Sequence, residues 1–223
     1  MQQIDHRVIK LLVGLIAVFL AFFMQAVSGV LLRSISESYY YQARDLFVGL
    51  LFAVAALFLC FSGKNTFERT LTVVASVLAA VVAIAPCACN RPNGTLSVLH
   101  YPSAVGLFVI LGYFCWRFRR TAMSKIKNYP EAKIRARVYT VCFAGMIGCG
   151  LMAAVYAMAK EPLDAKFPNY VFWMEALGLT SFGFSWLAAS HTLPLIANPK
   201  ERFSLSKGRA PEDNDNPKQY AQN

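Results

Sequence analysis

Charged residues are scarce in this chain. Asp, Glu, Lys and Arg make up 15% of its 223 residues, whereas about 25% is usual in soluble proteins. Hydrophobic residues make up 57% of the sequence, against about 45–50% in a soluble domain. This balance predicts a membrane protein rather than a soluble domain.

The motifs of several enzyme classes are missing as well. The sequence has no Walker phosphate-binding loop, no Gly-X-Ser-X-Gly motif and no dinucleotide-binding fingerprint. It has only three histidines, His6, His100 and His191, and its six cysteines are not spaced like a zinc motif. We therefore predict neither a metal site nor a cofactor.

Long apolar segments are the main feature that is present. Because about 20 helical residues cross a hydrocarbon core of about 30 Å, each segment is long enough to span a membrane. None shows the period-two alternation of a barrel strand. The segments predict an all-α, six-helix transmembrane bundle in one domain, residues 1–191, followed by a polar, disordered cytoplasmic tail, residues 192–223. Their approximate bounds are 8–32, 45–62, 69–88, 100–117, 136–158 and 169–190.

The basic residues are unevenly distributed between the loops. Of the 22 Lys and Arg residues, 17 fall in residues 1–10, 63–69, 117–137 and 200–218, and the other five fall in the alternate loops. The positive-inside rule then places both termini and the two basic loops in the cytoplasm. The net charge of +10 is thus read as a topology signal, with membrane lipids and not nucleic acid as the partner.

The first apolar segment has some features of a signal peptide. Ala26, Val27 and Ser28 before Gly29 resemble a cleavage site. The apolar run continues to Leu32, however, and is long enough to span. We expect an uncleaved signal-anchor, with cleavage as the alternative.

Two cysteines, Cys87 and Cys89, lie at the predicted outer surface. We expect them to be unpaired thiols. A disulfide between them, or a link to another chain, is the alternative that an oxidising compartment allows.

Small residues recur on two of the predicted helices. On the second, Asp45, Gly49, Ala53 and Ala56 predict a face that packs closely against a neighbouring helix. On the fifth, Gly145, Gly148 and Gly150 predict a helix-packing surface.

Polar residues gather at the predicted outer side, above all in "SISESYYYQARDLFVG", residues 34–49. Glu175 lies inside the sixth apolar segment, where a carboxylate is costly unless it is paired or neutral, and we expect Arg44 to be its partner. Asp45 is expected to be the N-cap of the second helix. The candidate ligand-binding residues are Ser36, Glu37, Tyr40, Arg44, Asp45, His100 and Glu175.

Three strings of the sequence resemble a group of small bacterial integral membrane proteins of unknown function. The strings are "SISESYYYQARDLFVGLLFA", "LHYPSAVGLF" and "VFWMEALGLTSFGFSWL". The resemblance implies a six-helix, multi-pass protein of a bacterial inner membrane and no activity. Members of the group are expected to have histidine at the position of Tyr40. The lack of this ligand argues against metal binding in the first loop. The matching positions are Ser34, Ser36, Tyr40, Arg44, Asp45, His100, Trp173, Glu175, Gly183, Ser185 and Trp186.

The order of Ser36 and Asp45 is faintly similar to the alkaline ceramidase and adiponectin-receptor superfamily, whose members hold zinc with three histidines. The predicted topology places His100 on the outer side and the other two histidines on the cytoplasmic side. Three histidines on two sides cannot share one ion, so such a zinc site is excluded under this topology.

Several functions are consistent with this outer polar cluster. The first is a pocket for a lipid headgroup or small polar ligand, or a purely structural polar lock. The second is a membrane-embedded hydrolase with His100 as general base and Glu175 or Asp45 orienting it. The third is a small-solute transporter, which would need a site near the midplane. The sequence identifies no particular small-molecule ligand, and it is consistent with either a monomer or a homo-oligomer.

Overall fold

The computed structural model describes residues 6–61, 63, 65–88, 97–126 and 130–192, with the backbone alone described at residues 130 and 131. Cys89 and the predicted tail after Thr192 lie outside these residues. The described chain is helical throughout, with no strand, and this confirms the all-α prediction. The elements are α1 (His6–Ser28), η1 (Ile35–Tyr40, a 3-10 helix), α2 (Arg44–Cys60), α3 (Thr66–Ile84), α4 (Ser97–Ser124), α5 (Pro130–Met158), α6 (Lys160–Lys166) and α7 (Tyr170–Ala189).

Each of the six apolar segments forms one long helix, but several helix ends differ from the prediction. α1 ends at Ser28 and not at Leu32, because Gly29 adopts a left-handed φ of 70° that stops a helix. α4 continues to Ser124 and α5 begins at Pro130, within the basic stretch that was predicted as a loop. Arg, Lys, Ala and Met in that stretch are good helix formers, so the helices extend beyond their apolar parts.

Four helical stretches are long and apolar enough to cross a membrane: His6–Ser28, Thr66–Ile84, Ser97–Ser124 and Ala132–Met158. α2 has 17 residues, about 25 Å at about 1.5 Å per residue, which is short of a hydrocarbon core of about 30 Å. α7 has 20 residues and contains Glu175. The helices are those of a membrane protein.

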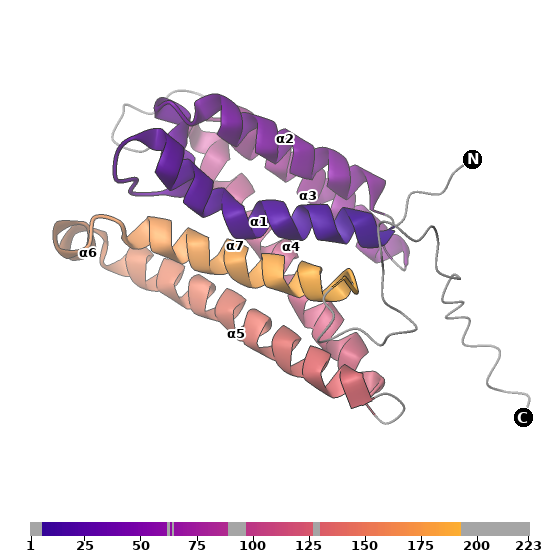
Figure 1. The fold of residues 1–223 in the computed structure, drawn as a ribbon. Helices are drawn as coiled ribbons and strands as arrows, with labels where there is room; N and C mark the ends of the chain where they lie inside the picture. Colours follow the sequence, from indigo (N-terminus) through magenta and orange to yellow (C-terminus); the bar gives the residue numbers. More distant parts are fainter. Residues whose placement is uncertain (1–5, 62, 64, 89–96, 127–129, 193–223) are drawn as a thin grey trace, which may run out of the picture.

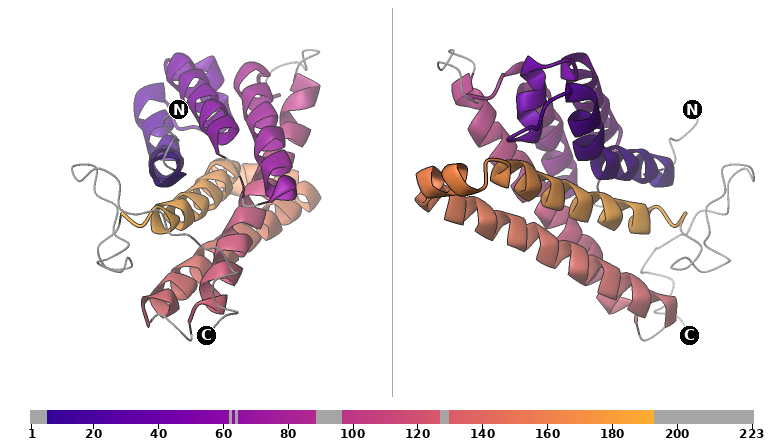
Figure 2. Two further views of the ribbon diagram at one scale, coloured as in Figure 1. Left: turned by 90° about the vertical axis from the view of Figure 1, so that its right-hand side faces the viewer. Right: turned by 60° about the vertical axis from the view of Figure 1, so that its left-hand side comes forward.

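The six long helices form a closed ring in the order α1, α2, α3, α4, α5 and α7, with α7 packed between α1 and α5 (Figure 1). The two longest helices, α4 and α5, run side by side in both views of Figure 2. The start of α1 and the end of α7 lie at one end of the bundle, here named the terminal end. η1 and α6 lie at the opposite end, here named the η1 end.

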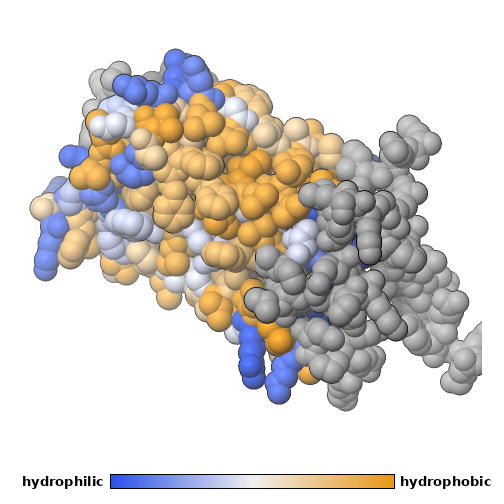
Figure 3. All heavy atoms as spheres, viewed as in Figure 1, coloured by the Kyte–Doolittle hydropathy of each residue, from blue (hydrophilic) through white to orange (hydrophobic). Residues whose placement is uncertain are grey.

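Hydrophobic residues cover the middle of the face shown in Figure 3, and hydrophilic residues gather toward its ends. This is the distribution that a bilayer selects, because charged groups are costly in hydrocarbon.

Aromatic residues fill the core near the terminal end. Trp186 is fully buried, and its ring centroid lies 5.1–5.9 Å from the centroids of five phenylalanine rings. These rings come from α2, α4, α7 and the residue after α2, so Trp186 joins three helices in one cluster. They belong to Phe58, Phe61, Phe114, Phe118 and Phe182.

α1 and α7 approach closely where Gly14 and Gly183 meet. A Cβ atom built on Gly183 would lie 2.6 Å from Val18 Cγ2 and 2.8 Å from the Gly14 carbonyl oxygen. Small residues allow this close approach, which is the usual way that membrane helices pack.

The predicted small-residue face of α2 is on the outside of the bundle, so that prediction is wrong. Asp45 and Gly49 are exposed, and Gly49 has open space where a Cβ would stand. α2 packs inward through bulkier residues such as Phe47 and Leu51. These larger side chains make many van der Waals contacts with the neighbouring helices, and such contacts stabilise helix packing.

The glycines of α5 divide between two faces. A Cβ on Gly145 would meet Ser181 of α7, as the predicted packing surface requires, whereas Gly148 and Gly150 face open space.

Candidate functional site

The connection between α1 and η1 is hydrogen-bonded to the first two turns of α7. Asn169 Nδ2 donates to the Leu32 carbonyl at 2.7 Å, and the Phe172 backbone N–H donates to the Arg33 carbonyl at 2.8 Å. The Ile35 backbone N–H donates to Glu175 Oε2 at 2.6 Å. Glu175 thus accepts a hydrogen bond from a main-chain donor, and a partner of this kind lowers the cost of placing a carboxyl group within a membrane helix.

Gln25, in the last turn of α1, holds the same connection from the other side. Its Nε2 donates to the Val30 carbonyl at 2.7 Å, and its Oε1 accepts from the Leu32 N–H at 3.1 Å. The left-handed turn at Gly29 brings the backbone to this amide.

Glu37 and Ser34 begin η1 by capping it. Ser34 Oγ accepts from the Glu37 N–H at 3.2 Å, and Glu37 Oε2 accepts from the Arg33 N–H at 2.6 Å. This exchange is close to a capping box, in which a hydroxyl and a carboxylate three residues apart satisfy free N–H groups. Glu37 is only 5% exposed, so its carboxylate serves the backbone.

We name this set of hydrogen bonds the η1 network. Between residues 30 and 37 it provides hydrogen-bond partners for backbone groups of a partly buried segment, most of which is not helical. Its side chains are those of Gln25, Ser34, Glu37, Asn169 and Glu175.

Tyr40 and His100 bind the connection that follows α3. The Tyr40 hydroxyl donates to the Cys87 carbonyl at 2.6 Å. His100, 4% exposed, lies with Nδ1 2.6 Å from the carbonyl oxygen of Ala85, the C-cap of α3. Because a carbonyl only accepts, Nδ1 carries the hydrogen. His100 therefore caps α3.

Cys87 is disulfide-bonded, so the expectation of an unpaired thiol at this position is wrong. Cys89 lies outside the described residues. Cys60, Cys115, Cys142 and Cys149 are free thiols.

Arg44 and Asp45 have different neighbours from those expected. The Arg44 guanidinium lies over the Tyr39 ring, 4.7 Å from its centroid, and Nη2 donates to the Tyr39 hydroxyl at 3.2 Å. It does not contact Glu175. Ala43 and not Asp45 is the N-cap of α2, and Asp45 is an exposed residue of the first turn, where its charge favours the helix dipole.

The seven candidate residues are therefore divided. Glu37, Tyr40, His100 and Glu175 bond to backbone groups, Ser36 is buried in η1, and Arg44 and Asp45 are outside the network. Within the described part of the chain, His100 makes no contact with either proposed orienting carboxylate. No three His, Cys, Asp or Glu residues there lie close enough together to hold a metal ion.

A groove lies between α1 and α7, directly beside the η1 network. Its volume is about 390 Å³, and its walls are mostly apolar. Phe22, Leu31 and Trp173 line it and are 54%, 80% and 60% exposed, so the groove opens on the outer surface of the bundle. The other lining residues are Ala21, Gln25, Ala26, Asn169, Phe172 and Ala176.

Gln25 and Asn169 belong to both the groove and the η1 network, and sequence reasoning missed both. Each amide offers two donors and one oxygen acceptor, so capacity remains beyond the bonds described above. A signal was present in the sequence, since Gln25 is a polar residue inside an otherwise apolar run.

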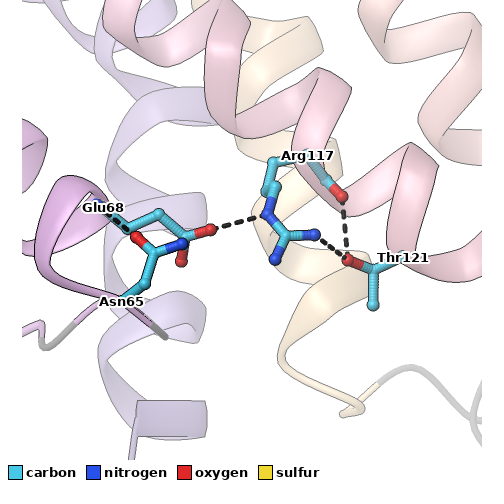
Figure 4. A network of polar contacts seen from close by, with 4 residues as sticks. All are labelled: Asn65, Glu68, Arg117 and Thr121. Carbon is cyan, nitrogen blue, oxygen red and sulfur yellow. Dashed lines mark hydrogen bonds and ion pairs between the residues drawn. The ribbon is translucent and has the colours of Figure 1, made fainter.

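A second polar contact that sequence reasoning missed joins α3 to α4 near the terminal end (Figure 4). Arg117 Nε donates to Glu68 Oε1 at 2.6 Å, and Arg117 Nη1 donates to Thr121 Oγ1 at 2.9 Å. Asn65 Oδ1 caps α3 by accepting from the Glu68 N–H at 2.8 Å. Asn65 followed three residues later by glutamate is a helix-start signal that could have placed Glu68 inside the helix.

Comparison of the chain with protein-family models, curated proteins and solved structures gave no match. The resemblance to small bacterial membrane proteins, and the fainter one to the ceramidase superfamily, stay predictions.

Proposed function

We propose that this chain is a six-span inner-membrane protein that binds a membrane lipid in the groove between α1 and α7. In this proposal α2 and α7 also cross the bilayer, both termini are cytoplasmic, and the η1 end faces outward. The distribution of Lys and Arg supports this orientation. The disulfide at Cys87 supports it too, because disulfides persist in oxidising compartments outside the cytoplasm.

The groove is the observation that carries the proposal. Its apolar walls match an acyl chain, and its two amides, Gln25 and Asn169, match the ester and phosphate oxygens at the head of a lipid. Both amides stand at the level of the η1 network. In a bilayer, that is where the headgroup region meets the hydrocarbon.

The η1 network supports the groove by fixing its polar residues. Gln25 and Asn169 are each held by a backbone group, which leaves little rotamer freedom to lose on binding. The polar cluster predicted as a pocket is thus proposed to be a structural lock that positions the neighbouring lipid site. The hydrolase and transporter alternatives gain no supporting contact from the described residues.

The proposal is tested by filling the groove. Ala26 is exposed and lines the groove, whereas Val27 is 41% exposed and does not. Ala26→Trp should weaken phospholipid binding at least about tenfold, or ~1.4 kcal/mol, and so lower the amount of copurified phospholipid measured by native mass spectrometry. The control Val27→Trp should leave it unchanged. Equal lipid occupancy in wild type and Ala26→Trp would reject the groove as the binding site.

A further inference from the structure

The two amides of the groove have fixed orientations. Gln25 Nε2 donates to the Val30 carbonyl while Oε1 accepts from the Leu32 N–H, so this amide cannot be turned over without losing both bonds. Asn169 Nδ2 lies 2.7 Å from the Leu32 carbonyl oxygen, which can only accept a hydrogen bond. Backbone partners therefore assign the nitrogen atom of each amide.

Each amide nitrogen keeps one hydrogen for a ligand. A side-chain amide has two N–H donors, and the backbone uses one of them in each case. Within the part of the chain that the structure describes, neither Gln25 nor Asn169 has a further hydrogen-bond partner on its nitrogen. Both residues are partly exposed and line the groove, so the second donor of each is available there.

The two donors come from the two helices that form the groove, and they are close together. Gln25 belongs to α1, and Asn169 is the N-cap of α7. One buried residue, Leu32, links them, since its N–H is bound by Gln25 and its carbonyl by Asn169. The backbone of a single residue thus sets the spacing of the two donors, and the groove presents them as a pair.

No charged side chain lines the groove among the described residues. Its nine lining residues are aliphatic or aromatic apart from the two amides. Arg33 and Lys166 are near the groove in sequence, but neither lines it. A phosphate or a free carboxylate carries a charge that is costly to place beside apolar walls without a cation. The groove is therefore suited to a ligand whose hydrogen-bond acceptors are neutral.

We infer that the groove recognises the paired ester carbonyls of a diacyl lipid, whatever its headgroup. This inference rests on the proposed function and specifies the class of lipid. A diacyl phospholipid carries two ester carbonyls, one at the head of each acyl chain, and each is a neutral acceptor. They lie where the hydrocarbon begins, which is the depth proposed for Gln25 and Asn169. Two N–H donors beside apolar walls match that arrangement.

Two lipids that differ only in this linkage test the inference. Dihexanoyl-phosphatidylcholine has two ester carbonyls, and its dihexyl ether analogue has none. Each is titrated by isothermal calorimetry into the full chain in a neutral detergent. The ester should bind at least about tenfold more tightly, because the ether leaves both amide donors without an acceptor. Dihexanoyl-phosphatidylglycerol should bind within about twofold of the phosphatidylcholine, because no charged side chain lines the groove.

The ratio of the ester affinity to the ether affinity is the readout for the variants. Gln25→Met and Asn169→Leu each remove one donor and should lower this ratio at least about threefold. Both residues also support the backbone, but a ratio of two affinities on the same protein does not depend on how much of it is folded. Gln42→Met, at an exposed amide outside the groove, is the control and should leave the ratio unchanged.

The wild-type ratio is decisive if either variant fails to fold. Equal affinities for ester and ether, both lost in Ala26→Trp, would overturn this inference and leave the groove as a lipid site. Much tighter binding of phosphatidylglycerol than of phosphatidylcholine would also overturn it, because the headgroup charge would then be recognised. Ester and ether binding that Ala26→Trp leaves unchanged would reject the proposed function itself, and this inference with it.

Discussion

The backbone N–H of Ile35 donates a hydrogen bond to Glu175 Oε2 at 2.6 Å, across 140 residues of sequence. The one carboxylate of α7 thus stabilises a main-chain amide in the first connection of the protein. This relationship makes Glu175 a structural group, and its removal has a definite cost.

Glu175→Ala should destabilise the protein by about 1–3 kcal/mol, because it leaves the Ile35 N–H without its acceptor. Glu175→Gln keeps an acceptor oxygen and should lose less. Thermal unfolding in detergent measures both, at about 2–4 °C per kcal/mol for a chain of this size. Glu161→Ala, at an exposed carboxylate of α6, is the control and should be neutral. A Glu175→Ala variant as stable as wild type would contradict the role of the η1 network.

Glu68 and Arg117 should be coupled in stability. Glu68 is 4% exposed, so removing Arg117 takes a cation that lies 2.6 Å away from a buried carboxylate. We expect Glu68→Gln and Arg117→Gln each to destabilise, and the double variant to lose less than the sum. A double-mutant cycle by thermal or denaturant unfolding should give a coupling energy of about 0.5–3 kcal/mol. Strict additivity would show that the contact contributes nothing to the packing of α3 on α4.

Stability should fall in acid because of His191. Burial and the neighbouring cations lower its pKa from 6.5 to about 3 in the folded protein. Between these values the unfolded chain binds a proton that the folded chain does not, so the free energy of unfolding decreases as the pH falls. The contribution is fully present above pH 6.5 and is lost progressively toward pH 3. His191→Asn, which tolerates the left-handed backbone, should flatten this part of the pH profile of unfolding. An identical acid slope in the variant would refute the assignment.

Gly183 and Gly148 should respond in opposite ways to a single methyl group. Gly183→Ala places a Cβ 2.6 Å from Val18 Cγ2, so α1 and α7 must separate, at a cost of about 1–3 kcal/mol. Gly148→Ala meets open space and should be neutral or stabilising by about 0.5–1 kcal/mol, because alanine favours the helix. Melting temperatures of the two variants in the same detergent check this. Equal effects would mean that the Gly14–Gly183 contact is not tight.

Hydrophobicity explains what could be predicted from the sequence. All six apolar runs form the long helices. In lipid, a helix pairs every backbone N–H and C=O within its own segment, so an apolar run of sufficient length is enough to predict it. Helix ends were less predictable, since Gly29 and the basic residues around 117–137 follow local conformational preferences and not hydropathy.

The partners of polar residues could not be predicted in the same way. The sequence suggested Arg44 for Glu175, whereas the structure gives Glu175 a backbone N–H. Main-chain donors carry no signature in the sequence, because every residue except proline has one. The path of the chain after Gly29 determines which main-chain N–H groups lie outside a helix and so need a partner elsewhere.

The closure of the helix ring by α7 has a consequence for biosynthesis. At about 5–20 residues per second, the 140 residues between Ile35 and Glu175 take about 7–30 s to translate. During that interval the carbonyls of Leu32 and Arg33 and the amide of Ile35 exist without the partners that α7 supplies. A nascent chain that stops before residue 169 therefore presents unsatisfied polar backbone beside α1, which is a recognisable mark of an unfinished product.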